Sequence, residues 1–290
     1  MANTMEMAKK FVPLLDEVYQ NASLTAVLDG AAELAQQGAN AGELVIPMLE
    51  MQGLGDYDRN TGYVSGDVSL TNATVSCNFD RGRMFSVDQM DNEESAGIAF
   101  GRLAGEFIRT KVVPELDAFR FASYASKDGV GKKEELLEDG SGVLAALREA
   151  STQMDEAEVS LEERYLFITP TLYGMIADLD LTRSRGVLER FAQVVQVPQT
   201  RFYTKISQKT GRSGQEMGGY EKAADGKELN FMIVHRPAVI QFEKHISPKI
   251  ITPMANPDAD AYKFGYRNVG IADVYQHKLA GVYASVKADA

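Results

Sequence analysis

Apolar residues at helical spacing mark the strongest predicted element of the chain, a helix over residues 91–113. Its apolar face carries Ala96, Phe100, Leu103 and Phe107. Pro114 follows, and a proline ring disfavours helical geometry in the residue before it. We therefore expect the helix to stop or kink at Pro114, with Val113 outside helical geometry.

Two more helices follow from the same kind of pattern. Residues 141–159 are amphipathic, and Thr169 followed by Pro170 is typical of an N-cap and first helical residue, which predicts a helix over residues 171–179. Residues 140–145 match the letters GxGxxA, but a polar segment precedes them instead of a strand, so we interpret them as a helix start and not as a dinucleotide site.

Alternating and β-branched residues predict strands over 44–50 and 64–79, with turn-forming residues between them. Together they indicate a long hairpin, residues 44–85. Because an isolated hairpin is marginally stable in water, its partner is expected to be another chain. Further strands are predicted at 164–168, 193–197, 230–235, 238–244, 262–268 and 281–286.

Helices and strands are mixed without βαβ alternation or an internal repeat, which predicts an α+β fold. Residues 127–142 are polar and are taken as a boundary. Residues 204–228 form a Gly-rich polar loop that is long for a compact domain, which indicates function or disorder. Residues 1–43 hold too few apolar side chains for a local core, so they need another surface to lie on or form a mobile arm.

Composition narrows the function. The 290 residues include 30 basic and 41 acidic ones, for a net charge of −11. This balance argues against nucleic-acid binding, which uses clustered Lys and Arg. Residues 1–100 are strongly acidic and 201–250 are basic, so one region can attract a neighbouring copy, or both are solvated surface. No apolar run reaches the ~20 residues of a membrane helix, and no secretory signal is expected.

Side chains that carry chemistry are sparse. His235, His245 and His277 lack metal-ligand spacing, and Cys77 has no nearby base to activate its thiol. One cysteine also excludes an internal disulfide. Asp258 and Asp260 lie in an Asn-Pro-Asp context that favours a turn over an acid–base pair. We therefore expect no catalytic residue, no metal and no cofactor, and a protein that is not an enzyme.

Five segments in order give the chain a family resemblance. They are 79–88 (FDRGRMFSVD), 112–121 (VVPELDAFRF), 164–170 (RYLFITP), 230–235 (NFMIVH) and 258–267 (DADAYKFGYR). On this pattern the chain resembles the major capsid protein of tailed bacteriophages, the Hong Kong 97 phage-type coat fold. The resemblance implies an N-arm, an extended E-loop hairpin, a P-domain with a long spine helix, and an A-domain.

That resemblance implies a division of the chain and a function. The parts would be the N-arm 1–43, the E-loop 44–85, the P-domain 86–130, the A-domain 131–236 with its loop 204–228 near a capsomer centre, P-domain return strands 237–278 and a C-terminal A-domain strand 279–290. The subunit would form pentamers and hexamers of an icosahedral shell around double-stranded DNA, assembled in the bacterial cytoplasm. Scaffolding, portal and cement proteins are the implied further partners. The packaged DNA would not be bound specifically, and no membrane would be involved.

Contacts between subunits are expected at the arm, the hairpin, its flank and the spine. The residues concerned are Phe11, Leu14, Tyr57, Tyr63, Arg81, Arg83, Gly97, Gly101 and Gly105. Ordinary packing within one subunit is the alternative for each. Some family members join subunits through an E-loop Lys, but residues 51–110 contain no Lys, so no such crosslink is expected.

Three alternatives stay open at this stage. An encapsulin nanocompartment shares the fold but encloses proteins in place of DNA, and a gene-transfer or defective-prophage particle cannot be separated from a phage by sequence. A soluble acidic metabolic enzyme is the alternative from another class, because residues distant in sequence can form a site that no motif reveals.

Overall fold

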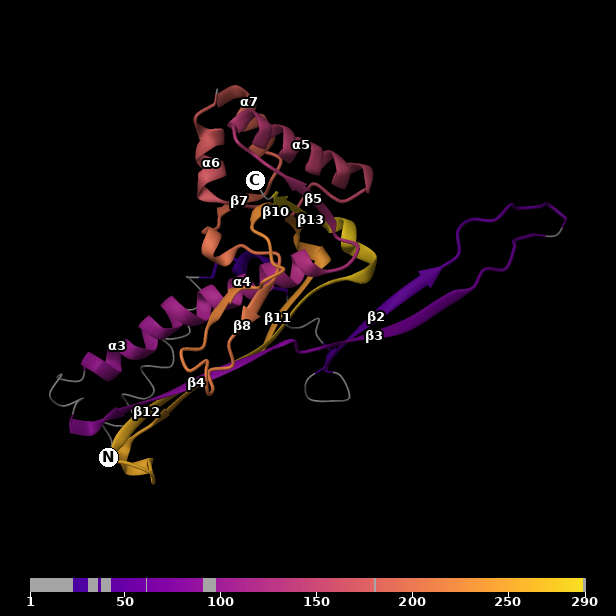
Figure 1. The fold of residues 1–290 in the computed structure, drawn as a ribbon. Helices are drawn as coiled ribbons and strands as arrows, with labels where there is room; N and C mark the ends of the chain where they lie inside the picture. The colour runs from indigo at the N-terminus through magenta and orange to yellow at the C-terminus, as the bar shows by residue number, and fades with distance from the viewer. Residues whose placement is uncertain are drawn as a thin grey trace.

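Two sheets and one long helical spine make up the body of the molecule, and a hairpin projects from it (Figure 1). The structure is a computed structural model that describes residues 23–30, 36–37, 43–60, 62–90, 98–179 and 181–288. The mixture of helices and strands confirms the α+β prediction.

Strand β10 is the centre of a five-stranded sheet. Its sequence LNFMIVH is buried at nearly every position, as expected for a strand with both faces covered. It pairs antiparallel with β13 and β6, and the edge strands β5 and β7 run parallel to those neighbours. The bounds are β5 (Gly131–Glu135), β6 (Arg164–Ile168), β7 (Gln193–Gln196), β10 (Leu229–His235) and β13 (Val282–Lys287).

Side chains of β10 alternate between two apolar layers. Phe231 and Ile233 pack with the helices on one face, and Met232 and Val234 pack with α4 on the other. The first face is covered by α5 (Gly140–Glu156), α6 (Pro170–Ala177) and α7 (Leu181–Leu188), and the second by α4 (Val113–Ser126). The predicted starts of α5 and α6 are confirmed: the Asp139 side chain accepts a hydrogen bond from the Gly142 N–H, and Thr169 is the N-cap before Pro170.

The spine continues through Pro114, so the predicted stop there is wrong. It consists of α3 (Ile98–Phe107), the π turn η3 (Ile108–Val112) and α4. Val113 has helical φ and ψ of −61° and −48°, and its N–H donates to the Ile108 carbonyl five residues back. A proline ring clashes with the carbonyl four residues before it in an α-helix. The wider π turn relieves that clash, which lets the helix go on to Ser126.

A sheet of three long strands lies under the first part of the spine (Figure 1). Its strand order is β11 (Val239–Ile251), β12 (Ala261–Val274) and β4 (Phe79–Asp88), and it is called the three-stranded sheet below. Phe79, Phe264 and Tyr266 from this sheet pack against Ile108 and Leu116 of the spine. The predicted strands 238–244 and 262–268 are present but longer. They pair from Val239 to Ile251, with a register shift between Glu243 and His245, and Pro248 is tolerated because β11 is an edge strand.

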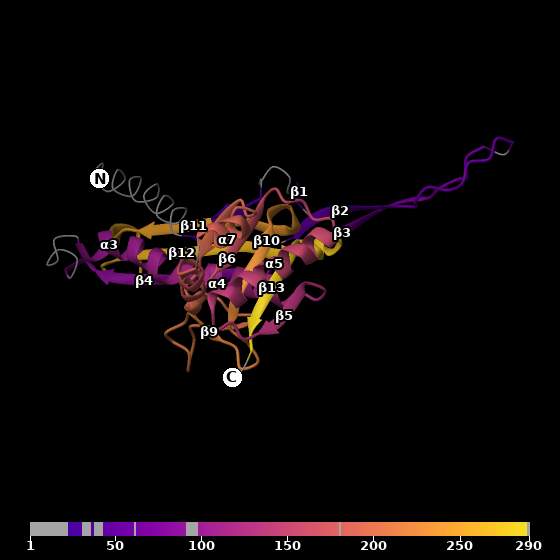
Figure 2. The ribbon, with the colours of Figure 1, turned by 90° about the horizontal axis from the view of Figure 1, so that it is seen from above.

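The projecting hairpin is shorter than predicted. Strands β2 (Glu43–Met51) and β3 (Val68–Ser76) pair antiparallel, and the two-residue β1 (Gln36–Gln37) adds to β2. Residues 79–85, which the sequence pattern places in the hairpin, belong to β4 and pair with β12 instead. Seen from above, the hairpin and α3 extend in opposite directions from the body (Figure 2).

Two polar stretches are more ordered than their sequences suggested. Residues 127–142, taken as a boundary, contain the edge strand β5, where charged residues suit an exposed edge. Residues 204–228 form a small hairpin from β8 (Ile206–Gln208) and β9 (Tyr220–Lys222). Its connecting residues 209–219 are called the flap below.

Residues 23–30 belong to the body, although the sequence placed them in an arm without a core. Leu28 is buried among α4 and the five-stranded sheet. Thr25 is also fully buried, and its hydroxyl donates to Asp117 of α4 at 2.8 Å. This attachment is mainly polar, so hydrophobic periodicity could not reveal it. Short turns complete the chain: η1 (Ala26–Leu28), η4 (Gln199–Arg201), η5 (Arg236–Ala238), η6 (Pro253–Ala255) and η7 (Gln276–Gly281).

Candidate assembly surfaces

The tip of the hairpin exposes apolar side chains far from the body. The Tyr57 and Tyr63 rings are tilted at 57° to each other with their centroids 4.8 Å apart, and Tyr63 is 89% exposed. Leu54 and Val64 beside them are also exposed. A cluster of apolar groups in water is unfavourable, so this surface suits contact with another molecule.

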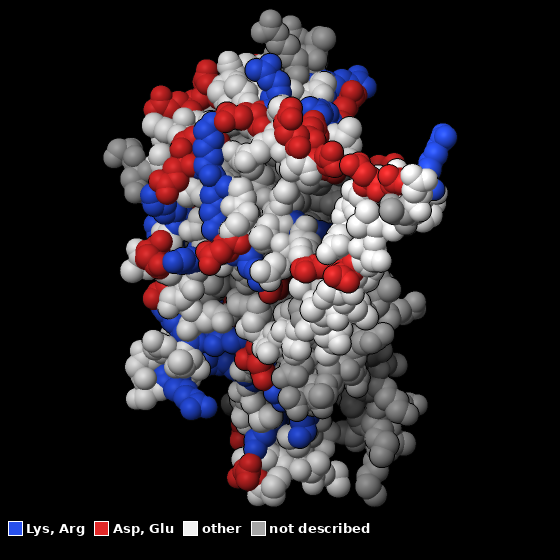
Figure 3. Space-filling model, turned by 90° about the vertical axis from the view of Figure 1, so that its right-hand side faces the viewer, with Lys and Arg blue, Asp and Glu red and all other residues white. Residues whose placement is uncertain are grey.

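Acidic side chains accompany these apolar groups. Residues 43–76 contain five acidic residues and one basic residue, Arg59. Figure 3 shows the face from which the hairpin projects, where acidic side chains lie among uncharged ones and a few basic side chains stand at the upper right-hand edge. A partner surface for the hairpin is therefore expected to be apolar with a basic rim.

The anchor cluster is a buried set of polar side chains that holds residues 23–30. Its members are Ser23, Thr25, Asp117, Arg120, Gln241 and Glu243. Asp117 accepts hydrogen bonds from the Ser23 hydroxyl, the Leu24 and Thr25 amides, the Thr25 hydroxyl and the Arg201 guanidinium.

Arg120 extends the anchor cluster to the three-stranded sheet. Its guanidinium donates to the Thr25 hydroxyl at 2.8 Å and to Glu243 at 2.6 Å, and its side chain is 2% exposed. Gln241 of β11 donates to the Thr25 carbonyl and accepts from the Tyr124 hydroxyl. These hydrogen bonds attach residues 23–30 to both α4 and β11. Burial raises the pKa of Tyr124 far above its ordinary value, so this phenol stays protonated.

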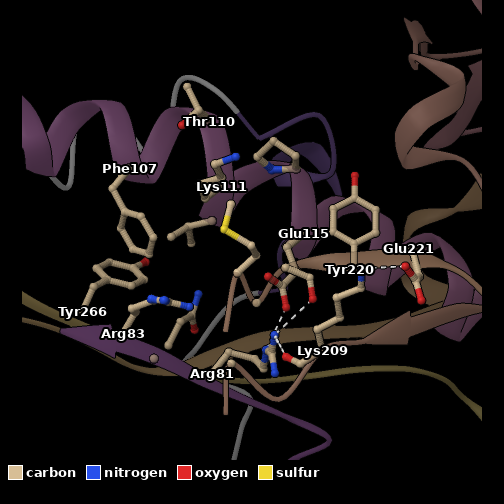
Figure 4. Close-up of a pocket in the computed structure, with 18 of the residues that line it drawn as sticks. Arg81, Arg83, Phe107, Thr110, Lys111, Glu115, Lys209, Tyr220, Glu221 and Tyr266 are labelled. Atoms are coloured by element: carbon tan, nitrogen blue, oxygen red, sulfur yellow. Dashed lines mark hydrogen bonds and ion pairs between the residues drawn. The ribbon is translucent and has the colours of Figure 1, made fainter. Parts of the chain in front are cut away.

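A groove of about 890 Å³ lies between the spine, β4 and the flap (Figure 4). Phe85, Phe107 and Tyr266 form part of its apolar lining, and the Phe85 and Phe107 rings meet edge to face at 4.7 Å. Arg83 and Lys111 are on its wall. Neither of these two cations has a carboxylate partner among the residues that the structure describes.

Arg81 joins the spine and the flap at one side of the groove. Its Nε donates to Glu115 of α4 at 2.7 Å, and its Nη2 donates to two flap carbonyls. Burial is the main influence on Glu115, whose side chain is 12% exposed, and it raises the pKa of this carboxyl although Arg81 lowers it. Burial likewise raises the pKa of Tyr220 to about 12.

The residues predicted from sequence fall in different places. Tyr57 and Tyr63 are at the exposed tip, as the prediction of an intersubunit contact requires, whereas Arg81 and Arg83 already make contacts within the subunit. An ideal Cβ at Gly105 would meet nothing within 4 Å, so that side of α3 is open. Gly101 lies in α3, and Phe11, Leu14 and Gly97 lie outside the described residues. The intersubunit roles of all nine residues stay predictions.

Sequence reasoning missed both the anchor cluster and the groove. The signal available for the groove was the alternation of Arg81 and Arg83, which puts both side chains on one face of a strand. Nothing in the sequence linked them to Glu115 or to the flap, because those contacts span 34 and 128 positions.

Within the described residues no group of three or more His, Cys, Asp or Glu side chains is arranged to hold a metal ion. No described helix combines the length and the apolar character that crossing a bilayer requires.

Similarity to known proteins is structural only. No protein-family model and no curated protein matches the sequence. A chain of Gordonia phage Cozz matches with a TM-score of 0.60 at 11% identity, over 92% of this chain and 87% of that one. A chain from the mature capsid of bacteriophage PhiM1 matches with a TM-score of 0.58 at 12% identity, over 86% and 83%.

A third matching structure is not from a phage. A chain of a virus-like particle from Pyrococcus furiosus matches with a TM-score of 0.56 at 10% identity, covering 96% of this chain and 98% of that one. The chain therefore has the fold found in tailed-phage capsid structures, as the resemblance in its sequence predicted.

Proposed function

We propose that this protein is a major capsid protein, which self-assembles through pentamers and hexamers into an icosahedral shell around the double-stranded DNA of a tailed bacteriophage. The observation that carries the proposal is the shared fold over more than four fifths of the chain, with matching capsid chains covered to a similar extent. The shell is the virion capsid, assembled in the bacterial cytoplasm.

The projecting hairpin supports this proposal physically. Its exposed tyrosines gain burial only against another molecule, and many such modest contacts add up in a closed shell through multivalency. The net charge of −11 suits a wall that does not grip DNA. We keep the division into arm, E-loop, P-domain and A-domain as part of the proposal, with separate scaffolding, portal and cement proteins as further partners.

Sedimentation and negative-stain electron microscopy of the protein expressed alone test the proposal. Closed polyhedra, tubes or sheets tens of nanometres across are the expected result. Rings of five or six subunits would indicate a coat protein that needs its scaffold. A compact dimer or tetramer would contradict the proposal and favour the enzyme alternative.

The hairpin gives a sharper version of this test. Tyr63→Ala should leave the fold of the subunit intact and abolish or slow assembly, because the exposed ring contributes nothing to the subunit's own core. Leu161→Ala is the control, since it removes another exposed large apolar side chain, 52% exposed, from the body instead of the tip. Equal assembly of both variants and the wild type would remove the hairpin from the proposed contacts.

A protein nanocompartment is the second candidate, favoured by the near-complete match to the virus-like particle chain. Analysis of shells purified from the native source separates the two, because a capsid holds double-stranded DNA and a nanocompartment holds proteins. Mature shells should also show no covalent ladder on a denaturing gel, because residues 51–110 contain no Lys to join subunits through the hairpin.

A further inference from the structure

The flap is held against β4 by arginine side chains instead of by packing. Arg81 Nη2 donates to the carbonyls of Lys209 (2.8 Å) and Gly219 (3.3 Å), which are the two ends of the flap. Arg83 Nη2 donates to the Glu216 carbonyl at 2.7 Å. Residues 212–217 are all exposed, and Met217 is 89% exposed. The flap therefore has no apolar anchor of its own.

Glu115 fixes the position of Arg81 from the spine. The planar guanidinium uses Nε for this carboxylate and Nη2 for the flap, so one side chain joins β4, α4 and the flap (Figure 4). The Glu115 carboxylate also lies 3.4 Å from Gln208 Nε2 of β8. Other charged or titratable groups near this point are Lys111, Lys209, Tyr220 and Glu221.

Glycine makes this close approach possible. Gly218 has a φ of +62°, and a Cβ at this position would lie 2.9 Å from Arg83 Nη1. Gly211 has a φ of +71° and is also next to Arg83 Nη1. A backbone with these glycines also reaches other conformations at little cost, so its contacts with the arginines decide where it lies.

We propose that the flap is a releasable strap, which Arg81 and Arg83 hold closed over the groove and which opens without unfolding either sheet. The base of the strap stays in place because β8 and β9 are paired and the Tyr220 hydroxyl donates to the Thr200 carbonyl at 2.9 Å. Only the residues beyond that base move.

Opening changes the surface that the subunit offers. It uncovers the apolar lining of Phe85, Phe107 and Tyr266 and frees the donors of Arg83 beside Lys111. In a shell subunit this would regulate when the groove can take part in contacts. That consequence rests on the proposed function, whereas the strap itself is a property of the isolated subunit and is tested there.

Trypsin cleavage after Arg212 measures the open state, because in the closed flap this exposed bond lies in a turn in which the Gln215 N–H donates to the Arg212 carbonyl at 2.7 Å, and cleavage requires that turn to open. When opening and closing are fast, the cleavage rate follows the population that is open. Mass spectrometry separates this product from cleavage at the buried Arg120 and Arg164, which requires unfolding of the body. The wild-type flap should be cut much more slowly than an unfolded chain.

Two variants weaken the strap in different ways. Arg83→Ala removes one exposed donor and should raise the rate at Arg212 about tenfold. Arg81→Lys keeps the charge but cannot bridge Glu115 and both flap carbonyls, so its rate should rise at least as much. Cleavage at Arg120 and Arg164 should not change in either variant.

Arg267→Ala is the matched control, because it removes an arginine from β12 that pairs with Asp80 and does not reach the flap. Its rate at Arg212 should equal that of the wild type. The proposal is overturned by a wild-type flap cut as fast as an unfolded chain, by unchanged rates in both variants, or by acceleration that matches the control. Shell assembly plays no part in this readout, so failure of the strap and failure of the proposed function are distinguishable.

Discussion

The anchor cluster and the flap attachment use the same chemistry in different surroundings. In both, charged side chains of the spine or its sheet hold a segment from elsewhere in the chain, partly through backbone groups. Asp117 and Arg120 do this with almost no exposure to water. Arg83 does it at the surface, where water competes for every donor.

This difference in burial sets how permanent each attachment is. A buried polar group that loses its partner carries the full cost of desolvation, whereas an exposed one is solvated again. Residues 23–30 are therefore part of the folded body, and the flap is a segment that can leave it. The two attachments should respond very differently to the removal of one partner.

The largest expected effect is at the centre of the anchor cluster. Asp117→Ala leaves the Ser23 and Thr25 hydroxyls, two backbone amides and Arg201 without their acceptor. We expect the free energy of unfolding to fall by about 3–5 kcal/mol, as for other broken buried charge pairs. Urea unfolding measures this.

Asp80→Ala is the control for that substitution, because its carboxylate pairs with Arg267 at the surface. It should leave the urea midpoint unchanged. If both variants lost a similar free energy of unfolding, burial would not explain why the anchor cluster is held more firmly than a surface ion pair. The comparison would then be wrong.

A smaller effect is expected at the edge of the same cluster. Thr25→Val preserves the shape of the side chain but removes the hydroxyl that donates to Asp117 and accepts from Arg120. The loss of stability should be about 1–3 kcal/mol, because Asp117 and Arg120 keep their other partners. Thermal or urea unfolding checks the value, and a loss equal to that of Asp117→Ala would contradict it.

The smallest effect, and one that favours the variant over the wild type as pH rises, is expected at Glu115 of α4, which positions Arg81 beside the flap. Burial raises the pKa of Glu115 in the folded state, so its protonated form favours folding at low pH. This contribution is fully present below the ordinary pKa of 4.5 and is lost as pH rises through the higher folded value. Glu115→Gln removes the titration, so the variant should lose less stability than the wild type as pH rises through that range.

Urea unfolding of both proteins at several pH values tests this expectation. A constant difference in stability across the range would show that Glu115 does not titrate as its burial requires. Trypsin cleavage at Arg212 in the same samples then reports whether the neutral side chain still positions Arg81.

Elements with a local chemical cause could be predicted from sequence. The start of α5 at Gly140, the start of α6 at Pro170 after its N-cap Thr169, and strand β10 all lie within one residue of their predicted places. The turn at Asn256 and Asp258 is also present, with the Asp258 amide bonded to the Asn256 side chain. In each case the residues that determine the structure are neighbours in sequence.

Elements whose cause is distant in sequence could not be predicted. Strand β5 is charged and is a strand only because β13, which lies 152 positions further along the chain, pairs with it. The buried position of Thr25 depends on Asp117, and the groove depends on contacts between β4, the spine and the flap. Polar and long-range contacts of this kind leave no periodic pattern.

The π turn before Pro114 has a geometric consequence for the spine. One added residue rotates everything that follows by roughly 100° about the helix axis, because an α-helix has 3.6 residues per turn. The same rod can thus direct Phe107 toward one sheet and Phe121 toward the other. The rotation of α4 relative to α3 about the helix axis, more than the length of the spine, aligns the two sheets. An insertion or deletion between residues 108 and 112 would therefore rotate one sheet relative to the other.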